Sequence, residues 1–170
     1  MGRWRPPAPA ASAYITPAGF EALQKELDDT WRRRREVVKA LAAAAAEGDR
    51  SENAEYIYRK KELAGLDRRI HYLQKRLPVL NIVRAAPAGD AIYFGAFVEL
   101  RNSADETLTY RIVGPDEADT SSGAISMDSP LAKALLGKQT GDEILIETPD
   151  KTATLNIVSI RYETSETQFD

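Results

Sequence analysis

The sequence predicts an α+β protein, in which an N-terminal antiparallel α-helical coiled-coil hairpin precedes a small antiparallel β-sheet domain with one short helix. Apolar residues recur at helical spacing between residues 17 and 80, and short β-rich runs separated by turn residues follow. Residues 17–79 carry 14 Lys and Arg against 11 Asp and Glu, a balance of +3, whereas residues 80–170 carry 7 against 15, a balance of −8. This asymmetry indicates two modules with different partners.

The composition excludes several classes of protein. The 170 residues include no cysteine, which rules out disulfides, zinc–thiolate sites and cysteine nucleophiles. No apolar run is long enough to span a bilayer. Residues 1–13 are basic and rich in Pro and Ala but lack the apolar core of a signal peptide, so we expect a disordered extension there and a short tail at residues 164–170. We therefore expect a cytoplasmic protein with no membrane partner.

The first predicted helix begins at Thr16-Pro17, because threonine can cap a helix and proline is tolerated at its first position. The pattern ends at Glu47-Gly48, where glycine is typical of a helix C-terminus. Between these ends the apolar residues fall at helical spacing: Phe20, Leu23, Leu27, Trp31, Val37, Val38 and Leu41.

The second predicted helix has the heptad pattern of a coiled coil, with Tyr56, Leu63, Ile70 and Leu77 at a and Leu66, Leu73 and Leu80 at d. Only Arg59 breaks the pattern, and Pro78 ends or kinks the helix. Two such helices joined by a short turn should pair as a hairpin over residues 14–80, with its tip at residues 48–56. A rod of this kind suits reaching into a partner, although an ordinary dimerising or bundle segment has the same pattern.

Residues 81–163 form the predicted sheet domain. One short helix is expected from a cap at Ser129, with Pro130 first and Gly137 just past its end. The β-rich runs are separated by turn residues and lie at 92–100, 108–113, 124–127, 143–147 and 153–162.

Long motifs in both modules resemble those of the Gre family of bacterial transcript-cleavage elongation factors, GreB type. The tip reads GDRSENAEY over residues 48–56, and RKK at 59–61 and DRRI at 67–70 follow it. The second module contributes FGAFV at 94–98, RIVG at 111–114 and SMDSPLAKALL at 126–136. The resemblance runs from Ile15 to Tyr162, and it implies that residues 81–163 form an FKBP-like domain.

The resemblance implies a function as well. A Gre factor inserts its hairpin into the secondary channel of bacterial RNA polymerase, while the FKBP-like domain docks on the channel rim. Two tip carboxylates, here Asp49 and Glu52, help the polymerase bind a second Mg²⁺ and cleave backtracked nascent RNA at its 3′ end. The factor completes the active site of the polymerase and is no enzyme itself. We therefore expect a monomer that holds no cofactor stably alone and shares Mg²⁺ only in the polymerase complex.

The residue chemistry at the tip permits this role and also a simpler one. Magnesium prefers oxygen ligands and is often held by one or two carboxylates, and two-metal hydrolysis needs an ion on each side of the scissile bond. Asp49 and Glu52 are three residues apart, so both can project from one tip. The same spacing suits a capping box with Asp49 as the cap. Arg50, Ser51 and Asn53 are the expected tip-positioning residues, and Asn53 also suits a local cap.

The second helix carries a basic strip, which we define as Lys61, Arg68 and Lys75, seven residues apart. Together with Arg69, these are the residues expected to contact extruded RNA through its phosphates, as the resemblance implies. A solvated coiled-coil surface has the same pattern, and Glu62 interrupts the strip.

Three rival functions remain from the sequence. A Gre-like inhibitor would enter the same channel without promoting cleavage, and the retained Asp49 and Glu52 argue against it. The other rivals are a plain coiled-coil interaction protein with no active tip and a free-standing hydrolase, which the sparse site disfavours. We do not expect prolyl isomerase activity, because a shared fold does not carry function, and His71 is expected at the helix surface.

Overall fold

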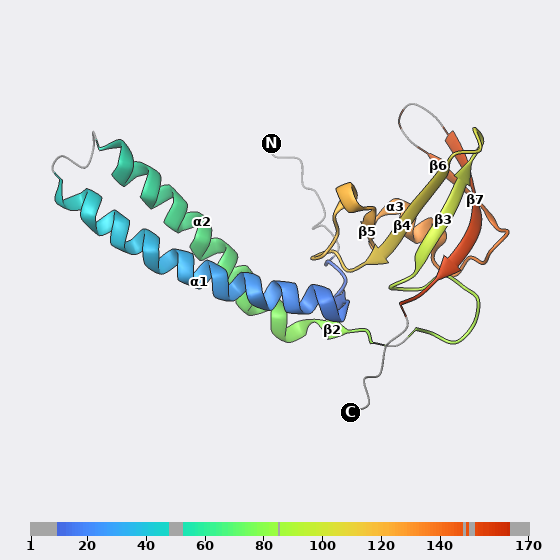
Figure 1. Ribbon diagram of the computed structural model, residues 1–170, viewed down its shortest axis with the longest axis horizontal. Helices are drawn as coiled ribbons and strands as arrows, with labels where there is room; N and C mark the ends of the chain where they lie inside the picture. Colours follow the sequence, from blue (N-terminus) through green and yellow to red (C-terminus); the bar gives the residue numbers. More distant parts are fainter. Residues whose placement is uncertain (1–9, 48–52, 85, 148, 150–151, 164–170) are drawn as a thin grey trace, which may run out of the picture. The chain divides into compact units, whose positions relative to one another are not determined.

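The computed structural model describes residues 10–47, 53–84, 86–147, 149 and 152–163. The chain divides into two compact units (Figure 1). One is the hairpin unit, residues 18–80, and the other is the globular unit, which combines the residues up to 17 with those from 81 onwards. In the described part of the chain, no helix is long and apolar enough to cross a membrane.

The hairpin unit contains the two predicted long helices. Helix α1 spans Pro17–Ala46 and α2 spans Ala54–Arg76, with lengths of 30 and 23 residues. Helix α1 begins at the predicted proline. Helix α2 gives way to a 3₁₀ turn, Leu77–Val79, because Pro78 has no amide hydrogen to continue the α-helical ladder. The predicted hairpin is confirmed.

The seam of the hairpin buries fewer apolar side chains than the sequence pattern suggests. On α1, Leu23, Thr30, Val37 and Ala44 are buried at intervals of seven residues, while α2 buries only Ile70 and Leu73. The Thr30 hydroxyl donates a hydrogen bond to the Glu26 carbonyl oxygen at 2.6 Å, so this polar side chain is satisfied inside the seam.

The globular unit is built on a five-stranded sheet with the order β5-β4-β3-β7-β6. Its strands are β3 (Phe97–Asn102), β4 (Thr107–Val113), β5 (Ala124–Ser126), β6 (Glu143–Glu147) and β7 (Thr152–Arg161). The expectation of an entirely antiparallel sheet needs one correction, because β5 pairs with β4 in parallel. The chain crosses from β4 to β5 through the 3₁₀ turn Thr120–Ser122 and does not return in a hairpin.

Most of the predicted strand ranges match the observed ones, and the first does not. The first β-rich run was expected from residue 92, but β3 starts at Phe97. Gly95 has a φ of +85°, a conformation that favours glycine, and the turn there separates Ile92 from the strand. Helix α3, Pro130–Leu135, has the predicted cap, in which the Ser129 hydroxyl accepts a hydrogen bond from the Ala132 amide at 3.2 Å.

The segment before α1 belongs to the globular unit. Strand β1 (Tyr14–Ile15) pairs in parallel with β2 (Asn81–Ile82). Ser12, inside the predicted extension, donates hydrogen bonds from its amide and hydroxyl to the Asp128 carboxylate at 2.9 and 2.5 Å. Thr16 donates in the same way to Glu117, at 2.7 and 2.5 Å. The extension was expected to end at residue 13 and the hairpin to begin at residue 14, whereas the described residues up to Pro17 group with the globular unit.

Candidate functional site

Most of the predicted tip lies outside the described residues. This applies to the two carboxylates, Asp49 and Glu52, and to Arg50 and Ser51. Asn53 is described, and it is the N-cap of α2. The described residues include the end of α1 and the start of α2, which flank the tip.

Asn53 connects the two helix ends. Its side-chain oxygen accepts a hydrogen bond from the Tyr56 amide at 3.1 Å, and its side-chain nitrogen donates to the Ala44 carbonyl oxygen at 2.7 Å. The first bond satisfies an amide at the start of α2, and the second satisfies a carbonyl in the last turn of α1. We call this pair of hydrogen bonds the Asn53 clamp. Asn53 thus holds the cap position that the capping alternative assigned to Asp49.

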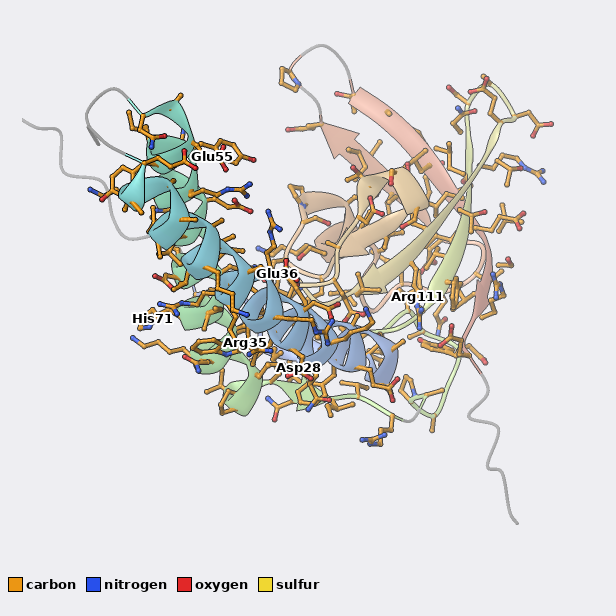
Figure 2. All side chains as sticks on the ribbon, turned by 60° about the vertical axis from the view of Figure 1, so that its left-hand side comes forward. Asp28, Arg35, Glu36, Glu55, His71 and Arg111 are labelled. Carbon is orange, nitrogen blue, oxygen red and sulfur yellow. The ribbon has the colours of Figure 1, made fainter. Side chains whose placement is uncertain are left out.

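Ion pairs occupy the first turns of α2 after the clamp. Glu55, which Figure 2 labels at the start of this helix, accepts a hydrogen bond from the Arg59 guanidinium at 2.7 Å. Arg59, the residue that breaks the heptad pattern, also pairs with Glu62 at 3.0 Å. Among the described residues, no group of three or more His, Asp or Glu side chains could hold a metal ion.

Arginines of α1 pair with carboxylates of α2 across the seam. Arg33 donates two hydrogen bonds to Glu62, from Nε at 2.9 Å and from a terminal nitrogen at 2.7 Å. The bond from Arg33 lowers the pKa of Glu62 below its ordinary value, and Glu62 in turn raises the pKa of Arg33. Arg34 pairs with Asp67 at 2.6 Å. Glu62 was predicted only as an interruption of the basic strip, and the structure places it at the junction of Arg33 and Arg59.

The basic strip is exposed. Lys61, Arg68 and Lys75 lie on the outer face of α2 and form no ion pair within the part of the chain that the structure describes. Arg69, the fourth expected RNA contact, has different surroundings. Its guanidinium donates to both carboxylate oxygens of Glu26 on α1, at 2.5 and 2.9 Å, so its charge is already balanced. His71 is exposed, as expected, and Figure 2 shows it on the outer side of α2.

The globular unit has a pocket of about 200 Å³, with Phe94, Gly95, Arg111 and Tyr162 in its lining. Arg111 (Figure 2) pairs with Glu163 at 2.8 Å, and its guanidinium lies 4.6 Å from the centre of the Phe97 ring. The Tyr162 hydroxyl donates to the Ala91 carbonyl and accepts from the Tyr93 amide, and burial raises the pKa of Tyr162. The two Tyr162 hydrogen bonds join the residue that follows β7 to the segment before β3.

Sequence reasoning missed the cross-helix ion pairs and the carbonyl contact of Asn53. A partial signal for the ion pairs exists, because Arg33 and Arg34 oppose Glu62 and Asp67 when the antiparallel helices are aligned about the tip. The contact from Asn53 to Ala44 needs the distance between two helix ends, which spacing along one helix does not provide.

Comparison with known proteins identifies the family. Residues 13–82 match the model "Transcription elongation factor, N-terminal", and residues 86–162 match "Transcription elongation factor, GreA/GreB, C-term". Transcription elongation factor GreB of Xanthomonas axonopodis pv. citri is 58% identical over 165 residues, covering 95% of this chain and 98% of that protein. GreB of Yersinia pestis is 51% identical, covering 90% and 91%.

Among solved structures, the Gfh1 protein of Thermus thermophilus, a GreA factor homolog, is similar to the chain. The identity is 30% with a TM-score of 0.41, and the match covers 88% of this chain and 99% of that one. The two domain models together span nearly all of residues 13–162. The chain therefore belongs to the GreA/GreB family of transcription elongation factors and is similar to its GreB members.

Proposed function

We propose that this factor inserts its hairpin into the secondary channel of RNA polymerase and stimulates cleavage of backtracked nascent RNA. Family membership supports a role in transcription elongation with RNA polymerase as the partner. The observation that carries the proposal within this chain is the Asn53 clamp. It joins the end of α1 to the start of α2, and these two helix ends flank the segment of sequence that contains Asp49 and Glu52.

The carboxylates of Asp49 and Glu52 act at the polymerase active site as a partial ligand set. Carboxylate oxygens suit Mg²⁺, but two of them leave most of its octahedral shell to other ligands. The nearest described acid on α2, Glu55, is paired with Arg59, which leaves it poorly placed to complete a metal site. A shared Mg²⁺ would supply charge stabilisation at the scissile phosphate. The chain is then a cofactor of the polymerase and turns over no substrate alone.

Docking on the polymerase is assigned to the globular unit, and the factor is assigned a monomeric state. The globular unit binds the rim of the channel from outside, and the factor works as a cytoplasmic monomer. The two compact units support a division of labour in which one unit docks and the other reaches. Arg50, Ser51 and Asn53 position the tip.

Cleavage of RNA in stalled elongation complexes tests the proposal. Asp49→Ala and Glu52→Ala should abolish stimulated cleavage while affinity for polymerase persists. Glu47→Gln is the matched control, since this exposed carboxylate precedes the turn and should leave cleavage unchanged. Near-normal cleavage by the alanine variants at saturating factor would overturn the tip assignment. Cleavage of free RNA without polymerase would instead indicate a free-standing hydrolase, and binding without any cleavage by the unmodified chain would indicate a channel inhibitor.

A further inference from the structure

The outer face of α2 alternates aromatic and basic side chains. Tyr58, Lys61, Gly65, Arg68, Tyr72 and Lys75 follow each other at spacings of three and four residues, which places them on one face of the helix. Tyr58 is 59% exposed and Tyr72 is 41% exposed, so both rings are accessible on this face. The predicted basic strip is therefore half of a mixed surface.

Each tyrosine ring is backed by an arginine that carboxylates hold in place. The Arg59 guanidinium lies 5.4 Å from the centre of the Tyr58 ring and is bound by Glu55 and Glu62. The Arg69 guanidinium lies 5.2 Å from the centre of the Tyr72 ring and is bound at two of its three nitrogens by Glu26. Cation–π contacts of this kind favour a fixed ring orientation. Two rings fourteen residues apart thus have the same support.

The cations between the rings have a different character. Lys61, Arg68 and Lys75 are exposed, and within the described residues no carboxylate neutralises them. At 1.5 Å per residue the two rings are about 21 Å apart along the helix, a length of about six nucleotides at 3.4 Å each. Gly65 lies midway on the same face, and a Cβ built there would meet only the Arg68 side chain, at 3.8 Å.

We propose that Tyr58 and Tyr72 stack on bases of extruded single-stranded RNA while Lys61, Arg68 and Lys75 contact its phosphates. Proteins that bind single strands without sequence preference combine aromatic platforms with a positive track, because every base has a flat face for stacking. Arg59 and Arg69 are positioning residues that hold the rings. The inference rests on the proposed function, since the RNA reaches α2 only when the hairpin lies in the channel.

Affinity of the full chain for backtracked elongation complexes tests the stacking. Two RNAs are compared, one with about ten natural extruded nucleotides and one in which those nucleotides are abasic and keep only their phosphates. Tyr58→Leu and Tyr72→Leu should each weaken binding to the natural RNA by about fivefold or more. The unmodified chain should bind the abasic RNA as weakly as a variant with both leucine substitutions binds the natural RNA. Affinity for the abasic RNA should not change with either substitution. Tyr58→Phe and Tyr72→Phe keep the rings and should restore binding.

A gain of binding is also expected. Gly65→Tyr adds a third ring at the midpoint and should tighten binding to the natural RNA relative to Gly65→Ala, which changes helix propensity without adding a ring. His71→Leu, beside Tyr72 but outside the mixed surface, is the matched control and should bind both RNAs as the unmodified chain does. Circular dichroism of each variant should report unchanged helicity, since these side chains lie outside the seam.

The affinity for backtracked complexes tests the stacking. Cleavage of complexes backtracked by two or three nucleotides tests the proposed function. If the unmodified chain binds natural and abasic RNA equally, stacking is overturned whether or not cleavage occurs. The same conclusion follows if the leucine variants weaken binding to both RNAs alike, which would indicate that the rings contact the polymerase protein. If cleavage of short complexes fails while the base dependence is present, the cleavage role in the proposed function fails, whereas insertion of the hairpin and the stacking stand.

Discussion

The globular unit and the hairpin unit differ in what stabilises them. A single cluster of eleven buried apolar residues lies in the globular unit, including Val98, Leu100, Ile112 and Ile157. Among the described residues of the hairpin, only five apolar side chains are buried: Leu23, Val37, Ala44, Ile70 and Leu73. The hairpin adds hydrogen bonds and ion pairs between its helices, such as the Asn53 clamp and Arg33–Glu62. Its stability should therefore depend on salt and pH more than that of the globular unit, because exposed charges are screened.

The largest expected effect is the loss of a core side chain from the globular unit. Ile112→Ala removes a fully buried residue and should lower the free energy of unfolding of this unit by about 2–5 kcal/mol. Amide hydrogen exchange of the full chain should show faster exchange in β3, β4 and β7 and unchanged exchange in α1 and α2. Leu145→Ala, on an exposed side chain, is the control and should change little. Equal loss of protection in both units would show that they unfold together.

The next effect concerns the close approach of β1 to Gly114, which follows β4 within the same globular unit. A Cβ at Gly114 would lie 2.0 Å from the Tyr14 carbonyl oxygen, so Gly114→Ala forces one backbone to move. We expect a cost of about 1–3 kcal/mol. The Val83 amide, which donates to the Ile15 carbonyl at 3.0 Å, should exchange faster. Gly65→Ala in α2 meets no such obstacle and should be neutral or stabilising. An unchanged Val83 exchange rate in the Gly114 variant would contradict the expected displacement.

A smaller effect is expected at the Asn53 clamp. Asn53→Ala removes the cap of α2 and the bond to Ala44, and should destabilise the hairpin by about 1–2 kcal/mol. Amides in the first turn of α2 and the last turn of α1 should exchange faster, and the sheet should be unaffected. Asn53→Asp keeps a capping oxygen but has no amide donor for Ala44, so it should recover only the first of these losses. Full recovery by aspartate would show that the Ala44 bond contributes nothing.

The smallest effect is electrostatic. The folded-state pKa of Glu62 is lowered, mainly by Arg33, so its stabilising contribution is complete above the unfolded-state pKa and is lost as pH falls through the lower folded value. The hairpin should lose stability in this acidic range and also at high salt. Glu62→Gln should cost up to about 1 kcal/mol at neutral pH and reduce both dependences. A variant with the same pH profile as the unmodified chain would assign the acid sensitivity to other carboxylates.

The same contrast explains which features the sequence could predict. The start of α1 at Pro17, the end of α2 before Pro78 and the cap of α3 at Ser129 follow from local chemistry, and the structure has all three. The seam positions of Thr30 and Ala44 escaped prediction, because a hydroxyl and a methyl group do not stand out in an apolar pattern. Their burial depends on the facing helix.

Other features depend on contacts between distant segments. The parallel pairing of β5 with β4 and that of β1 with β2 join residues whose strand character is predictable but whose partners are not. The placement of Arg69 beside Glu26 is of the same kind, because 43 residues separate them. The roles of Asp49 and Glu52 came from the resemblance of the tip motif, which the family match supports as a whole, and remain predictions for these two residues.

The Asn53 clamp has a consequence for how such factors diversify. The hydrogen bond from Asn53 to Ala44 encloses residues 45–52, so the helices are tied together by groups that flank the turn. The side chains between Ala44 and Asn53 can therefore change without loss of the contacts that pair the two helices. A substitution in that short segment then changes the chemistry at the tip, for example from activation to inhibition, while the two helices stay paired.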